Sequence, residues 1–94
     1  MTRLSDGEIE RGLAALTGWK RDGDAIAKTF RFASFRDAIA FVDRVAPAAD
    51  AADHHPDILI RYRRVTLTYS THSEGGVTEK DLAGAREADR LAGG

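Results

Sequence analysis

The spacing of apolar residues changes along this chain from a helical repeat to an alternating repeat and back, and then does so a second time. Apolar side chains recur at helical spacing in residues 9–16, 38–49 and 82–91, and they alternate with other residues in 26–32, 58–62 and 65–69. A repeat of about 3.6 residues indicates an amphipathic helix, whereas alternation indicates a strand. With a further short strand beginning at Trp19, the predicted element order is α-β-β-α-β-β-α.

This order predicts the fold class. Strands in adjacent pairs, with helices between the pairs, are typical of α+β proteins. We therefore expect a four-stranded antiparallel sheet with three helices on one face. The outer face of the last strand, with Thr66, Thr68, Ser70 and His72, is polar and available for a site.

Each predicted helix starts at a residue that can cap it. A Ser or Thr is followed three residues later by an acidic residue, which is the spacing of a capping box. The pairs are Ser5–Glu8, Ser34–Asp37 and Thr78–Asp81. The first helix is expected to end at Thr17-Gly18, because a glycine there can leave helical geometry easily.

Two prolines define the middle helix. Pro47 lies within its apolar stripe and lacks a backbone donor, so we expect a kink or two abutting helical pieces there. Pro56 disfavours helical geometry at the residue before it, so the helix should end near His54–His55. Asp22-Gly23-Asp24 is a turn signal for the first hairpin, and the second is expected to turn at Arg63–Arg64.

Composition narrows the class of protein. The 94 residues hold 14 basic and 15 acidic side chains and no Cys, so the formal charge is −1 and disulfides are excluded. We expect one domain over residues 1–94, with oligomerisation supporting its small core. The balanced charge argues against direct nucleic-acid binding. The N-terminus has no signal-peptide pattern and no apolar run approaches about 18 residues, so we expect a cytoplasmic protein without a membrane span.

The three histidines lie close together in the sequence, at predicted element boundaries. His54-His55-Pro56 falls where a helix must end, and a helix C-terminus favours a protonated imidazole. This pair could offer one charged and one neutral ring near neutral pH, or its rings could simply cap free carbonyls. His72, at the end of a strand, is a third candidate. Asp81 could cap the last helix, hold an imidazole in one tautomer, or do both.

Other kinds of site are less well supported. Two His and one Asp could form a metal triad, but the i, i+4 His spacing of helical zinc sites is missing. Ser70, Thr71 and Ser73 lie near His72 without a nucleophile motif. A basic cluster at Arg61, Arg63 and Arg64 is more typical of a solvated hairpin end than of a nucleic-acid site. Gly75-Gly76 lacks the lysine of a phosphate loop. The residues thus favour a small imidazole acid–base site for proton transfer, hydration or dehydration.

The spacing of these residues also resembles a known family. Asp50, His54-His55-Pro56, Tyr62, His72 and Asp81 together resemble the signature of the pterin-4a-carbinolamine dehydratases. Thr71-His72 followed by Gly75-Gly76-Val77-Thr78 is similar as well. The resemblance extends from about Ser5 to Leu91, which is nearly the whole chain.

The resemblance implies a fold, a reaction and a set of site residues. It implies a four-stranded antiparallel sheet with three helices on one side, in a homodimer or homotetramer joined through sheet edges and helices. The implied activity is that of a 4a-hydroxytetrahydrobiopterin dehydratase, which removes water from the pterin to give a quinonoid dihydropterin and so serves an aromatic amino-acid hydroxylase. No metal or organic cofactor is implied, because the pterin is the substrate.

The implied catalytic residues are His54, His55, His72 and Asp81. His54 and His72 are the acid–base candidates, His55 would hydrogen-bond the pterin or the leaving hydroxyl, and Asp81 would orient a histidine or the pterin. Asp50 matches the charged position of the signature. Departures from the family pattern are Pro47, the Arg63–Arg64 turn, and Ile58 where some relatives have Trp.

The resemblance leaves alternatives open. Some family members act as dimerisation partners of a transcription factor, and related domains assist enzyme assembly, so a non-catalytic binding protein is the alternative function. A different pterin, such as a molybdopterin-related substrate, is a third possibility.

Overall fold

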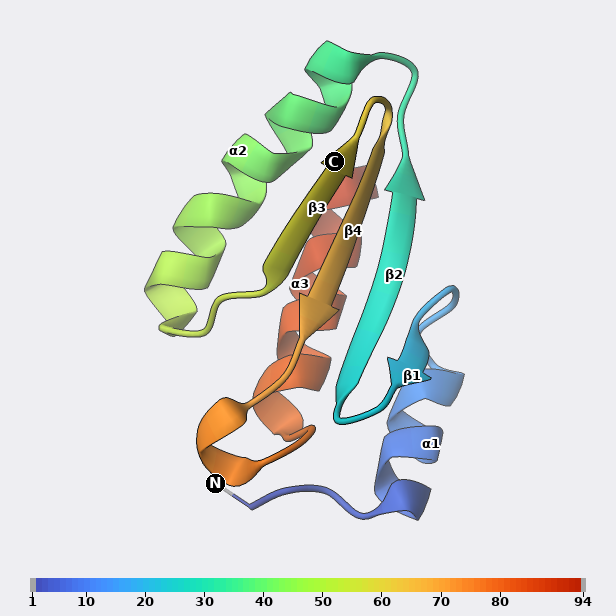
Figure 1. Cartoon of the computed structure of the whole chain (residues 1–94), viewed down its shortest axis with the longest axis vertical. Coiled ribbons are helices and arrows are strands. Elements are labelled where there is room, and N and C mark those ends of the chain that lie inside the picture. Colours follow the sequence, from blue (N-terminus) through green and yellow to red (C-terminus); the bar gives the residue numbers. More distant parts are fainter. Residues whose placement is uncertain (1, 94) are drawn as a thin grey trace.

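The computed structural model describes residues 2–93, and it confirms the predicted class and element order (Figure 1). The sheet consists of β1 (Lys20–Asp22), β2 (Ala25–Arg31), β3 (Asp57–Arg61) and β4 (Arg64–Tyr69). Their order in the sheet is β1-β2-β4-β3, and every neighbouring pair is antiparallel. The second hairpin therefore inserts its last strand, β4, into the centre and leaves β3 at an edge.

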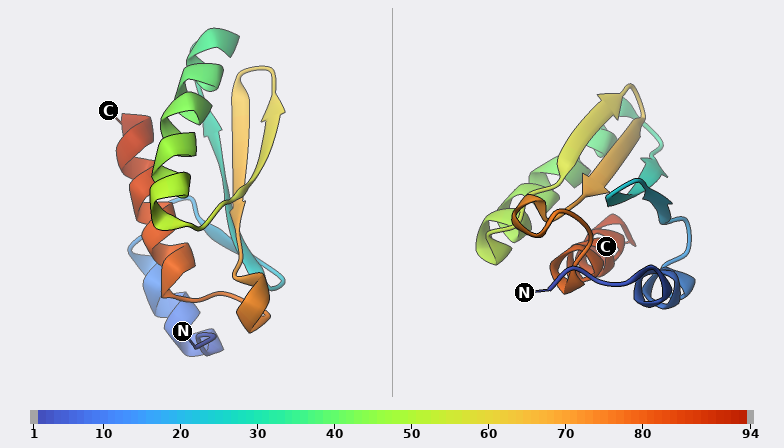
Figure 2. Two further views of the ribbon diagram at one scale, coloured as in Figure 1. Left: turned by 90° about the vertical axis from the view of Figure 1, so that its left-hand side faces the viewer. Right: turned by 60° about the horizontal axis from the view of Figure 1, so that its bottom comes forward.

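Three helices lie on one side of this sheet. They are α1 (Asp6–Ala14), α2 (Phe35–Ala52) and α3 (Glu79–Gly93), and within residues 2–93 the opposite face of the sheet has no helix on it (Figure 2). A short 3-10 helix, η1 (His72–Glu74), joins β4 to α3. The end of α2, η1 and the beginning of α3 gather at the same end of the molecule (Figures 1 and 2).

The helix starts follow the predicted caps. Ser5 and Glu8 form a complete capping box: the Glu8 amide donates to the Ser5 hydroxyl (3.2 Å), and the Ser5 amide donates to the Glu8 carboxylate (2.9 Å). The Ser34 hydroxyl accepts from the Asp37 amide at 3.0 Å. These bonds satisfy amides that have no partner inside the helix.

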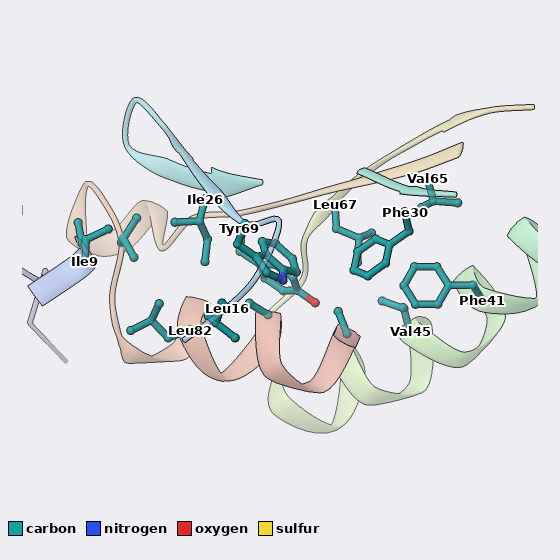
Figure 3. Packing of buried hydrophobic residues seen from close by; sticks show 14 of the residues in the cluster. Ile9, Leu16, Ile26, Phe30, Phe41, Val45, Val65, Leu67, Tyr69 and Leu82 are labelled. Atoms are coloured by element: carbon teal, nitrogen blue, oxygen red, sulfur yellow. The ribbon is translucent and has the colours of Figure 1, made fainter. Parts of the chain in front are cut away.

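The core lies between the sheet and the helices (Figure 3). Phe30 on β2 packs against Phe41 on α2 with ring centroids 4.8 Å apart. Trp19 packs near Tyr69, with centroids 5.9 Å apart, and its indole nitrogen donates to Asp89 on α3. These contacts attach α2 and α3 to the sheet.

The end of the first helix differs from the expectation, and one of the two alternatives at Pro47, two abutting helical pieces, is excluded. The first helix ends at Ala14 instead of Thr17-Gly18, because the Leu16 amide bonds to Leu13 in a tighter turn. The middle helix continues through Pro47 as one element, Phe35–Ala52, rather than as two pieces. Pro47 is exposed, and so is Asp43, whose carbonyl loses its helical partner; that carbonyl can therefore bond to water.

The second hairpin turns one residue earlier than expected. Arg61 pairs with Arg64, so the loop consists of Tyr62 and Arg63 rather than Arg63–Arg64. Tyr62 adopts a left-handed φ of 56°, which is uncommon for a bulky residue. This register places Val65 and Leu67 on the helix-facing side, where both are fully buried. Burial of the apolar face therefore determines the position of the turn.

Candidate active site

His54 is positioned by the way α2 ends. Asp53 follows the last helical residue with φ 50° and ψ 42°, in the left-handed region. The Asp53 amide donates to the Asp50 carbonyl and the His54 amide donates to the Ala49 carbonyl, both at 3.1 Å. This is the bonding pattern of a Schellman motif, in which the chain turns back across the helix end. It directs the His54 ring inward, so that only 12% of the side chain is exposed.

The inward His54 ring meets Asp81. The distance from His54 Nε2 to Asp81 Oδ1 is 2.6 Å, and the Asp81 side chain is completely buried. Asp81 lies in the first turn of α3, where its Oδ2 accepts from the Thr78 amide at 2.8 Å. The structure therefore gives Asp81 both contacts that the sequence left open, one with the helix start and one with a histidine.

Thr71 completes the surroundings of Asp81. Its hydroxyl donates to Asp81 Oδ2 at 2.8 Å and lies 2.8 Å from the Thr78 hydroxyl. This contact is not predicted by the sequence, in which Thr71 stands out only as a possible nucleophile near His72. A signal was present: Thr71 is in phase with Val65, Leu67 and Tyr69, so the alternation places a polar side chain on the buried face.

Tyr69 supports the other side of His54. The two rings are stacked, with centroids 6.1 Å apart and planes 23° apart. The Tyr69 ring fits beneath α3 because residue 84 is glycine: a Cβ there would lie 2.6 Å from Tyr69 Cε1. Burial, together with the negative charges of Asp81 and Glu87, raises the pKa of Tyr69 to about 12. Tyr69 thus remains a neutral phenol beside the pair.

His55 is paired separately and is exposed. Its Nε2 lies 2.8 Å from Asp50 Oδ1, with 57% of the His55 side chain and 76% of the Asp50 side chain exposed. Asp50 lies in the last turn of α2, which ends at Ala52, so this pair borders the same α2–β3 loop as His54. An exposed contact of this kind contributes little to stability.

The sequence predicted that His72 ends a strand, but the structure places it elsewhere. β4 stops at Tyr69, and His72 begins η1, where it is exposed. After β4, Thr71 and Gly76 form an isolated β-bridge on either side of η1. The short helix η1 ends at Gly75, which has a left-handed φ of 70°. His72 directly follows Thr71, so the Asp81 contact holds the chain on which His72 is presented.

A groove of about 450 Å³ lies between α2 and α3. Its walls are largely apolar and include Ala48, Ala52 and Leu91, with His54 and Tyr69 beneath them. Lys80 and Glu87 are the charged residues that line it. Of the histidines, only His54 lines this groove.

The other candidate groups are not organised as sites. Within residues 2–93 no group of three or more His, Asp or Glu side chains is arranged to hold a metal ion. The Ser70 hydroxyl donates to the Asp24 carbonyl, and the Arg61, Arg63 and Arg64 cluster lines a hollow at the exposed hairpin end. No helix in the described part of the chain is long and apolar enough to cross a membrane.

Comparison with known proteins identifies the family of this chain. The family profile described as Pterin 4 alpha carbinolamine dehydratase matches residues 2–91. The chain belongs to this family. A Roseiflexus sp. strain RS-1 protein named "Putative pterin-4-alpha-carbinolamine dehydratase" is 57% identical over 90 residues, which cover 96% of this chain and 97% of the relative. A Thermomicrobium roseum protein of the same name is 52% identical over 92 residues, covering 98% and 99%.

Solved structures of the family have the same fold. A Brucella melitensis protein, described as a transcriptional coactivator/pterin dehydratase, superposes with a TM-score of 0.94 at 40% identity and covers 97% of this chain and 99% of its own. A pterin dehydratase-like protein, identified as a RuBisCO assembly factor in the alpha-carboxysome, superposes with a TM-score of 0.67 at 26% identity and covers 80% and 87%. The family fold therefore occurs in proteins described by different roles.

The packing of Tyr69 beneath Gly84 can be tested with one added methyl group. Gly84→Ala should lower the free energy of unfolding in urea by about 1–3 kcal/mol, because the methyl group overpacks the Tyr69 ring. Gly7→Ala is the matched control, since its Cβ meets only the Arg11 side chain at 3.5 Å. It should raise stability by up to about 1 kcal/mol, as alanine does in helices. Equal stabilisation by both substitutions would contradict a tight contact.

Proposed function

We propose that this protein is a 4a-hydroxytetrahydropterin dehydratase that uses histidine acid–base catalysis. The observation that carries this proposal is the 2.6 Å contact between His54 and the fully buried Asp81, in a chain that belongs to the carbinolamine dehydratase family. Its biological setting would be recycling of a pterin cofactor for an aromatic amino-acid hydroxylase.

The reaction requires two proton transfers. The C4a–oxygen bond breaks, the leaving hydroxyl takes a proton and departs as water, and N5 loses its proton as the N5=C4a double bond forms. Hydroxide is a poor leaving group, so a general acid must act at the oxygen and a general base at N5. Each such group typically accelerates a reaction by about 10²–10⁴-fold. The balance of atoms requires neither a metal nor an organic cofactor.

The surroundings of His54 suit one of these transfers. Asp81 holds one ring nitrogen and stabilises the positive charge that develops when the other nitrogen takes a proton, as the aspartate of a catalytic triad does. His72 is exposed on η1 and free to contact the substrate for the other transfer. His55, on the neighbouring loop, would hydrogen-bond the pterin or the leaving hydroxyl.

Removal of the two imidazoles tests the proposal directly. The dehydration rate of freshly generated 4a-hydroxytetrahydropterin would be measured with the wild type, His54→Ala, His72→Ala and the double variant. We expect His72→Ala to fold normally, because the side chain is exposed, and to lose about 10²-fold or more of the catalysed rate.

The matched control is Glu74→Ala, which removes another exposed side chain of η1. It should leave the rate unchanged. A wild type that gives no acceleration would rule out the dehydratase, and a fully active His72→Ala variant would remove His72 from the mechanism.

The exposed edge strand supports a homodimer. β3 is exposed along its whole length, and Ile58, Leu59 and Ile60 are 40%, 53% and 36% exposed. An apolar edge of this kind is a template for pairing with another strand. Antiparallel pairing with a second copy, centred on Leu59, would place each Asp57 opposite the partner's Arg61. The charges would then be complementary at both ends of the paired strands.

Charged substitutions at Leu59 test this pairing. Leu59→Lys should shift the mass in sedimentation equilibrium from dimer to monomer, because two like charges would lie opposite each other. Leu59→Glu should do the same, and an equimolar mixture of the two variants should associate again. Monomeric wild type, or two variants that both keep the wild-type mass, would contradict the proposed interface.

A second candidate function is that of a binding protein without catalysis. It is favoured by the descriptions of the two solved relatives, a coactivator/dehydratase and an assembly factor. In that case partner binding would persist in the His54→Ala/His72→Ala variant, and no variant or wild type would accelerate dehydration.

A further inference from the structure

The hydrogen bonds around Asp81 form a chain whose direction can be deduced. The Thr71 hydroxyl has one proton, and it is donated to Asp81 Oδ2. The 2.8 Å contact between the Thr71 and Thr78 hydroxyls must therefore use the proton of Thr78. The Thr78 oxygen in turn accepts from the Lys80 amide at 3.2 Å. Every proton in the chain thus points toward Asp81.

This direction determines the protonation of the pair. Asp81 Oδ2 already accepts two hydrogen bonds, from the Thr71 hydroxyl and the Thr78 amide, which stabilise an ionised carboxylate. An ionised carboxylate can only accept a hydrogen bond, so Asp81 Oδ1 accepts the hydrogen bond that His54 Nε2 donates across 2.6 Å. His54 is then held with its proton on Nε2, and Nδ1 is the nitrogen that remains for the substrate.

We propose that Thr71 and Thr78 are positioning residues that fix the tautomer of His54, so that Nδ1 is the atom that exchanges protons with the pterin. The part of this inference that concerns the pterin rests on the proposed function, whereas the tautomer is a property of the free protein. This chain of hydrogen bonds also joins three segments of the polypeptide: the Thr71 backbone after β4, the start of α3, and the α2–β3 loop.

Thr71 is the better residue for a test, because its hydroxyl contacts only members of this hydrogen-bond chain, Asp81 and Thr78, and caps no helix. It precedes η1 without forming a side-chain cap, whereas Thr78 accepts from the amide of α3 at Lys80. Thr71→Val keeps the shape of the side chain and removes only the hydroxyl. Thr71→Ser keeps the hydroxyl and removes only a methyl group.

The first readout needs no substrate. Long-range proton–nitrogen NMR correlations of the imidazole ring should show His54 protonated at Nε2 in the wild type and in Thr71→Ser, and a mixture of tautomers in Thr71→Val. A wild-type ring protonated at Nδ1 alone would overturn the proposal, whether or not any variant folds.

The second readout is the rate of dehydration. Thr71→Val should lose roughly ten- to a hundredfold in kcat with little change in KM, since the lost bond is one to a charged group. Thr71→Ser should recover most of the rate. Thr17→Val, the same change in an exposed turn, should have neither effect.

The possible outcomes separate this inference from the proposed function. If Thr71→Val lowers stability but leaves the tautomer and kcat unchanged, the residue is merely structural and the proposal fails. If the wild type does not catalyse dehydration but Thr71→Val alters the tautomer, the proposed function fails and the positioning role stands.

Discussion

The burial of one carboxylate is the constraint on which this end of the molecule depends. Asp81 is completely excluded from solvent, and an unpaired charge in such a place would be strongly destabilising. Its oxygens are satisfied by the Thr71 hydroxyl, the Thr78 amide and the His54 ring. These donors come from three segments that are far apart in sequence. Satisfying the carboxylate therefore brings the end of α2, the chain before η1 and the start of α3 into fixed relative positions, and the candidate site results from that arrangement.

The fold could be predicted from the sequence because its signals are local. Apolar periodicity determined the class and the element order, and Ser5–Glu8 was predicted as a capping box from spacing alone. The errors arose where packing overrides a local preference. Pro47 is accommodated because its turn of α2 faces solvent, and the second hairpin turns at Tyr62 because Val65 and Leu67 must face the core. Neither the continuous helix at Pro47 nor the turn at Tyr62 can be predicted from residue types alone.

The site was predictable in part, for a related reason. Helix-ending signals identified the position of His54, and cap spacing identified Asp81, but their contact depends on the Schellman turn at Asp53, which residue types alone do not specify. Thr71 was missed as a structural partner because a polar residue type gives no sign of burial, although its alternation with Val65, Leu67 and Tyr69 places it on the buried face. His72 was expected in a strand, whereas the bridge between Thr71 and Gly76 lifts it onto η1. The separate contact of His55 with Asp50 likewise depends on the way in which α2 ends.

The proposed dimer would bear on the same region. In pairing centred on Leu59, the partner subunit's Tyr62 and Arg63 would follow its Arg61 toward Pro56, and hence toward the loop that carries His54 and His55. Association through β3 would thus border the candidate site, which meets the apolar groove between α2 and α3 at His54.

Titration of the protein with a stable reduced pterin, followed by NMR of the histidine rings, tests whether the substrate contacts the three imidazoles. We expect saturable changes in the ring signals of His54, His55 and His72, because a pterin bound for proton transfer must contact these imidazoles. Saturable binding that leaves the three rings unchanged and perturbs only the walls of the α2–α3 groove would contradict this expectation, and so would the absence of binding at pterin concentrations that saturate related dehydratases.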